Sequence, residues 1–206
     1  MLHLNTVSPA LRALVGKVAE LDYFSPFRLC EGTALALQLG HRLSVDADFV
    51  SENEFDKETL AAKVASLLPD VTDVYVGELG VFLKSAGIKV DFLSWNTPFI
   101  RSAVKEEKLQ LVHVEEIAAM KLFAITQRGE KKDYYDIAVL LQHYSLEKLL
   151  GFYSERHPKN DVSVVVRFLV SYSDIEAQPD PVTLVPLTWN NAKQLMKKSV
   201  DDFIGR

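Results

Sequence analysis

The chain has 206 residues, of which 48% are hydrophobic and 25% charged, a composition that suits one folded domain with or without a helical extension. A net charge of −5 argues against tight, nonspecific binding of duplex nucleic acid, although a local basic patch could still receive RNA or a triphosphate. No apolar run reaches the roughly eighteen residues of a membrane span, so no membrane contact is expected. Cys30 is the only cysteine and the N-terminus does not look like a signal peptide, so we expect a cytoplasmic protein.

The metal-binding side chains of the sequence favour a hard cation over zinc. The histidines are scattered, with none forming a close pair: His3, His41, His113, His143 and His157. Zinc sites are built mainly from nitrogen and sulfur ligands, which this chain scarcely offers. Carboxylates are plentiful, so a metal ion bound here would be held by oxygen.

The first half of the chain predicts alternating helices and strands. Apolar residues at helical spacing predict helices over residues 9–21, 33–39 and 55–68, of which the second ends at Gly40 and the third at Pro69. Short apolar runs predict strands over residues 27–30, 47–50, 71–76, 79–84 and 88–93. Residues 85–87 between the last two strands are typical of a hairpin turn.

The character of the sequence changes after Pro98, where helical patterns dominate. Helices are predicted over residues 114–127, 133–143, 146–153 and 190–204, and a proline-containing loop over 174–186. Residues 161–172 are rich in β-branched side chains, so helix and strand are both open there. We therefore predict an α/β (α+β) core over residues 1–105 and a helical C-terminal region over residues 106–206.

Residues 31–33 are a candidate phosphate loop. A short strand leads into Gly32 and then into a helix that begins near Thr33, which exposes backbone N–H groups at a positive helix end. Gly32 would let a phosphate approach the backbone, and Thr33 could donate its hydroxyl. The alternative, favoured for these residues alone, is an ordinary strand–turn–helix with a threonine at the helix N-cap.

Three aspartates on two predicted strands form a candidate metal site. Asp46 and Asp48 are one residue apart, so on a strand they point to the same face. Asp91 lies in an otherwise apolar strand, where a charge is costly unless it is paired or bound to a metal. A polar loop at residues 46–48 and an ion pair or an exposed face at Asp91 are the alternatives. Together the three carboxylates could hold two Mg²⁺ ions about 3.5–4 Å apart beside the phosphate loop.

Basic and acidic residues of two predicted helices are further candidates. Lys121 and Arg128 lie along one edge of a largely apolar helix, where a cation reaches either water or a phosphate. Asp133 and Asp136 lie on the apolar stripe of the next helix. The structural interpretation pairs Lys121 or Arg128 with Asp136 across the two helices. The functional interpretation has Lys121 contact a triphosphate while Asp133 and Asp136 orient the basic residues.

These motifs occur in an order that resembles the AbiEii/AbiGii toxin nucleotidyltransferases of the DNA polymerase β-like nucleotidyltransferase superfamily. The resemblance rests on residues 31–37 (EGTALAL), 40–49 (GHRLSVDADF), 89–91 (KVD), Lys121, Arg128 and 132–136 (KDYYD). It covers roughly residues 29–141. In two places the chain departs from the pattern: Glu31 stands where many relatives have a second glycine, and Thr33 replaces a serine of the wider superfamily.

The resemblance implies a mixed central sheet with flanking helices and Mg²⁺-dependent (alternatively Mn²⁺-dependent) transfer from a nucleoside triphosphate. Several relatives are toxins of toxin–antitoxin systems and some modify tRNA, which implies an RNA or tRNA acceptor and a cognate antitoxin as partners. By motif match, the implied metal ligands are Asp46, Asp48 and Asp91. The implied nucleotide-binding residues are Gly32, Thr33, Arg42, Ser44, Lys121 and Arg128, supported by Asp133 and Asp136.

Three functions remain open at this point. The first is an active nucleotidyltransferase, as a toxin acting on RNA. The second is a small-molecule nucleotidyltransferase of the antibiotic-modifying kind, which the low basic charge mildly favours. The third is a catalytically silent nucleotide-binding module, and Glu31 in the phosphate loop is the feature that favours it.

Overall fold

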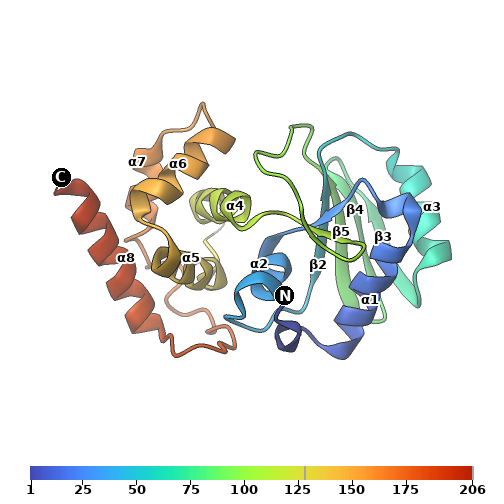
Figure 1. The fold of residues 1–206 in the computed structure, drawn as a ribbon, viewed down its shortest axis with the longest axis horizontal. Coiled ribbons are helices and arrows are strands. Elements are labelled where there is room, and N and C mark those ends of the chain that lie inside the picture. Colours follow the sequence, from blue (N-terminus) through green and yellow to red (C-terminus); the bar gives the residue numbers. More distant parts are fainter. Residues whose placement is uncertain (128, 206) are drawn as a thin grey trace. The chain divides into compact units, whose positions relative to one another are not determined.

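The computed structural model describes residues 1–127 and 129–205, and Figure 1 shows its helices and strands. The chain divides into two compact units, residues 1–113 and 114–206. The first unit contains a sheet and its helices, and the second is helical. Among the described residues, no helix has both the length and the apolar character required to cross a membrane.

The first unit is built on a seven-stranded mixed sheet in the order β3-β4-β5-β2-β1-β7-β6. Its strands are β1 (Arg28–Leu29), β2 (Ala47–Ser51), β3 (Val71–Val76), β4 (Gly80–Ser85), β5 (Ile88–Ser94), β6 (Val104–Glu106) and β7 (Leu109–Leu111). Its helices are η1 (Leu4–Thr6), α1 (Pro9–Glu20), η2 (Asp22–Phe24), α2 (Glu31–Leu39) and α3 (Lys57–Leu67). The β2–β5 and β1–β7 pairs are parallel and the other pairs are antiparallel, so the predicted mixed α/β sheet is confirmed.

Most predicted elements of the first unit are present within a few residues, and two strands were not predicted. β6 and β7 have three residues each, which is too short for an alternation of apolar and polar residues to identify a strand. Because β7 pairs with β1, the first unit extends to His113, past the boundary predicted after residue 105. The α2 helix begins at Glu31, two residues earlier than predicted, and ends as predicted at Gly40, whose φ of 70° is left-handed.

An aromatic cluster fills the core on one face of the sheet. Phe49 of β2 and Phe92 of β5 are register partners, and their rings stack with centroids 5.2 Å apart. Phe24 stacks on Phe92, and Phe27 meets Phe92 edge to face. Since side chains alternate along a strand, the residues before Phe49 and Phe92 point to the opposite face.

The second unit consists of α4 (Val114–Gln127), α5 (Lys131–His143), α6 (Leu146–Arg156), α7 (Val162–Phe168) and α8 (Trp189–Ile204). The β-branched run that left helix and strand open is the helix α7. Asp161 caps it by accepting a hydrogen bond from the backbone N–H of Ser163. Tyr134 and Tyr135 of α5 are buried against Trp189 of α8, so both tyrosines belong to the core of this unit.

Candidate active site

Asp48 and Asp91 lie side by side on the central sheet. Asp48 of β2 is the register partner of Asp91 of β5 in a parallel pair. Partners in neighbouring strands point to the same face, so both carboxylates lie on the face opposite the stacked Phe49 and Phe92 rings. The sequence thus brings two of the three predicted metal ligands together through ordinary strand pairing.

Asp91 is the most deeply buried carboxylate of this group, with 6% of the residue exposed. Its Oδ2 accepts a hydrogen bond from Lys89 Nζ at 2.6 Å, within the same strand. Its Oδ1 is buried and has no hydrogen-bond partner among the described residues. A buried carboxylate oxygen without a donor is costly, so this atom is available for a cation.

Asp48 carries the clearest electrostatic signature of a crowded acidic site. Burial, followed by the negative charges of Glu31 and Asp91, raises the pKa of Asp48 from 3.8 to about 7. Lys89 lowers this pKa and Asp46 adds a smaller increase. When negative charges lie so close together, protonation of a carboxylate is favoured unless a cation lies among them. Carboxylates that bind a metal ion share this electrostatic environment.

Asp46 is held next to this pair by the start of α2. The Thr33 hydroxyl donates a hydrogen bond to the backbone oxygen of Asp46 at 2.5 Å. The same hydroxyl shares a hydrogen bond of 2.8 Å with the Ser44 hydroxyl. Thr33 and Ser44, both predicted to bind nucleotide, therefore fasten the segment before β2 to α2 in this structure, which fixes where Asp46 stands.

The predicted phosphate loop has an unusual backbone and a close neighbour. Glu31 adopts a φ of 56°, a left-handed conformation that glycine adopts more readily. At Gly32 a Cβ would overlap Nη2 of Arg42, which is itself buried with 4% of the residue exposed. Gly32 was predicted to let a phosphate approach the backbone, and in this structure the group that lies against it is the Arg42 guanidinium.

The donor chemistry of Asp46, Asp48 and Asp91 fits a hard divalent cation, because all three offer carboxylate oxygens. Within residues 1–127 and 129–205, however, no group of three His, Cys, Asp or Glu side chains is arranged to hold a metal ion. The cation that lies against Asp91 in this structure is the ammonium group of Lys89. The sequence left an ion pair at Asp91 open as an alternative, and the structure identifies Lys89, two residues earlier on the same strand face, as the partner.

The predicted residues of the second unit form a separate ion-pair cluster. Lys121 Nζ lies 2.7 Å from Asp133 Oδ1 and 3.1 Å from Asp136 Oδ2, and all three side chains are almost fully buried. This arrangement is the interhelical pairing that the structural interpretation anticipated. Arg128 lies outside the described residues.

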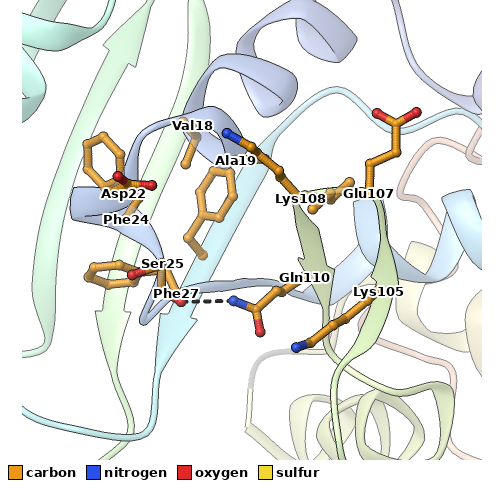
Figure 2. Close-up of a pocket in the computed structure, with 12 residues that line it drawn as sticks. Val18, Ala19, Asp22, Phe24, Ser25, Phe27, Lys105, Glu107, Lys108 and Gln110 are labelled. Atoms are coloured by element: carbon orange, nitrogen blue, oxygen red, sulfur yellow. Dashed lines mark hydrogen bonds between the residues drawn. The ribbon is translucent and has the colours of Figure 1, made fainter.

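A cavity of about 290 Å³ in the first unit is lined by none of the predicted site residues. Figure 2 shows Phe24 and Phe27 on one side of it and Lys105 and Lys108 on the other, with Gln110 donating to the Ser25 carbonyl at 2.9 Å. Phe49 also lines this cavity, so the cavity lies on the aromatic face of the sheet and not on the carboxylate face.

Comparison with known proteins places the chain among nucleotidyltransferases. A protein of Aquifex aeolicus (strain VF5), aq_aa25, is 29% identical over 199 residues, covering 94% of this chain and 95% of the relative. MenT4, a nucleotidyltransferase toxin of Mycobacterium tuberculosis H37Rv, has a similar fold with a TM-score of 0.64 and 15% identity, covering 93% of this chain and 80% of MenT4.

The antibiotic-resistance factor ANT(2'')-Ia shares the fold more narrowly, with a TM-score of 0.55 and 16% identity over 73% of this chain and 92% of that protein. The family described as nucleotidyl transferase AbiEii toxin, type IV toxin–antitoxin system, matches residues 12–203. That match covers almost the whole sequence and includes every predicted site residue. The chain therefore belongs to the AbiEii nucleotidyl transferase toxin family.

Proposed function

We propose that this protein transfers a nucleotidyl group from a nucleoside triphosphate to an RNA acceptor, using a divalent cation held by Asp46, Asp48 and Asp91. The observation that carries the proposal is the register pairing of Asp48 with Asp91 on one sheet face. The raised pKa of Asp48, caused by burial and by the charges of Glu31 and Asp91, and the unpartnered Oδ1 of Asp91 support it, because both are features that a bound cation would compensate.

The chain's own residues have distinct tasks in this proposal. Asp48 and Asp91 bind the cation with carboxylate oxygens, and the Thr33 hydrogen bond to Asp46 keeps the third carboxylate beside them. A bound Mg²⁺ or Mn²⁺ supplies a Lewis acid that neutralises triphosphate charge and acidifies the attacking hydroxyl. Asp91, the most buried of the three, is the residue assigned to accept the proton of that hydroxyl.

The proposed acceptor and partner are supported by the family alone. A type IV toxin family favours an RNA acceptor and an antitoxin encoded alongside, in the cytoplasm. The fold similarity to ANT(2'')-Ia keeps a small-molecule acceptor as the second candidate. The left-handed Glu31 in the phosphate loop is the observation that favours a silent module as the third.

The proposal is tested by incubating the protein with each α-³²P-labelled nucleoside triphosphate, MgCl₂ and either total tRNA or a set of aminoglycosides. We expect label on RNA that is lost with EDTA and in Asp46→Asn, and retained in Asp201→Asn, which removes an exposed carboxylate of α8. Label on an aminoglycoside alone would select the second function. Equal label with wild type and Asp46→Asn would contradict a catalytic role for the carboxylates.

A further inference from the structure

Charged residues of β2 and β5 lie together on the carboxylate face of the sheet. Asp48 and Asp91 are partners across β2 and β5, and Lys89 precedes Asp91 by two residues on the same face. Asp46 directly precedes β2, and its negative charge, like those of Asp91 and Asp48, acts on Lys89. Lys89 is thus the basic residue of β5, and its positive charge interacts with the carboxylates of Asp46, Asp48 and Asp91.

The two partners of the Lys89–Asp91 ion pair differ strongly in exposure. The Lys89 side chain is 54% exposed, whereas that of Asp91 is 8% exposed. Asp91 is consequently fixed in the sheet, while the flexible lysine reaches it from the solvent side and can leave without disturbing the core. Burial lowers the pKa of Lys89, but the hydrogen bond to Asp91 and the charges of Asp91, Asp48 and Asp46 raise it overall, so the ammonium stays charged.

We propose that Lys89 is a built-in counter-ion of the metal site: its ammonium holds Asp91 in the metal-free protein and leaves Asp91 Oδ2 when a divalent cation binds. This inference rests on the proposed function, because it concerns the same carboxylates. In this structure Lys89 contacts Asp91 Oδ2, while Oδ1 of the same carboxylate has no hydrogen-bond partner among the described residues.

The exchange has opposite effects on the stability of the metal-free protein and on its affinity for the cation. Lys89 relieves the repulsion between Asp48 and Asp91 before metal binds, so it stabilises the metal-free fold. The same contact has to be given up on metal binding, so Lys89 weakens the affinity for the cation. A half-exposed ion pair has a modest strength, which corresponds to about a 1.5- to fivefold change in affinity.

The test is calorimetric titration of the full chain with MnCl₂, at constant pH and salt, without nucleotide. We expect Lys89→Gln to bind Mn²⁺ about 1.5- to fivefold more tightly than wild type (the range follows from the strength of such ion pairs). Lys89→Arg keeps the charge and should restore the wild-type affinity. Lys197→Gln, which removes a lysine paired with Asp201 on the surface of α8, should leave it unchanged.

Thermal unfolding provides a second readout that does not depend on activity. In chelator the Lys89→Gln variant should unfold at a lower temperature than wild type. Added Mn²⁺ should raise the unfolding temperature of the variant by more than that of wild type. Equal affinity of Lys89→Gln and wild type, with Mn²⁺ binding lost in Asp91→Asn, would overturn the role of Lys89 and leave the proposed metal site standing. Failure of every variant to bind Mn²⁺ would overturn both.

Discussion

Asp48 and Asp91 are register partners of two parallel strands, and the residues that follow them, Phe49 and Phe92, are register partners whose rings stack. One pairing of β2 with β5 thus builds both the aromatic core and the acidic face. A shift of one residue would turn the carboxylates into the aromatic core and the rings onto the carboxylate face, so core packing fixes the position of the candidate site. The stability of the core and the geometry of the site are therefore linked.

The first prediction concerns the pH dependence of stability in the metal-free protein. The pKa of Asp48 is about 7 in the folded state against 3.8 for an ordinary aspartate, so the folded state binds the proton more tightly. The associated stabilisation is present below about pH 4 and is lost as pH rises through about 7. It amounts to at most about 4 kcal/mol, and solvent around the half-buried side chain reduces it.

Urea unfolding in chelator at about pH 5 and about pH 8 checks this expectation, with Asp48→Asn as the comparison. The free energy of unfolding of Asp48→Asn relative to wild type should be higher at the upper pH, because asparagine does not ionise. Added Mg²⁺ should remove part of the difference by favouring the ionised carboxylate. An identical difference at both pH values would show that Asp48 titrates normally.

The buried Lys121 cluster predicts a large loss of stability in Lys121→Met. This change leaves Asp133 and Asp136 fully buried without their shared cation, which costs about 3–5 kcal/mol. The matched control is Lys132→Met, which removes an exposed lysine paired with Glu130 and should cost less than about 1 kcal/mol. Chemical denaturation monitored by tryptophan fluorescence compares the two, and equal losses would contradict the account.

The hydroxyl of Thr33 predicts a difference between two conservative replacements. Thr33→Val keeps the shape and leaves the buried carbonyl of Asp46 without its donor, at a cost of about 1–3 kcal/mol. Thr33→Ser keeps the hydroxyl and should retain both transfer activity and most of the stability. Thr33→Ser should therefore have a higher melting temperature and a higher transfer rate than Thr33→Val. Similar values for the two variants would show that the hydrogen bond to Asp46 is unimportant.

The left-handed backbone of Glu31 predicts that glycine is better than alanine at this helix position. Glu31→Gly should be more stable than Glu31→Ala by about 1 kcal/mol, because only glycine adopts a φ of 56° without strain. At Ala62, an exposed position inside α3, the order should reverse, with Ala62→Gly costing about 1 kcal/mol. Denaturant midpoints measure both, and a less stable Glu31→Gly would refute the strain at Glu31.

Local sequence patterns were sufficient for much of the fold. The periodicity over residues 114–127 predicts the bounds of α4, and the apolar alternation over 88–93 predicts all but one residue of β5. The strands β6 and β7 were missed because three residues are too few to show a period, and the two strands form by pairing, β7 with β1 and β6 with β7. The fold class could thus be predicted, whereas the extent of the first unit depended on tertiary contacts.

The candidate site was predictable in its residue types and less so in its contacts. The one-residue spacing of Asp46 and Asp48 and the charge of Asp91 within an apolar strand both pointed to the carboxylate face. The hydrogen bond from Lys89 to Asp91 depends on a side-chain rotamer, and the packing of Arg42 on Gly32 depends on the path of the chain after α2. Neither follows from spacing alone.

The account is tested most directly by where a divalent cation binds. Crystals grown with MnCl₂ and a non-hydrolysable nucleoside triphosphate, measured at the manganese edge, locate the ion by its anomalous signal. We predict a peak about 2.0–2.3 Å from carboxylate oxygens of both Asp48 and Asp91, with Lys89 Nζ moved away from Asp91. A bound nucleotide whose manganese lies away from Asp48 and Asp91 would contradict the claim that this register pair is the metal site.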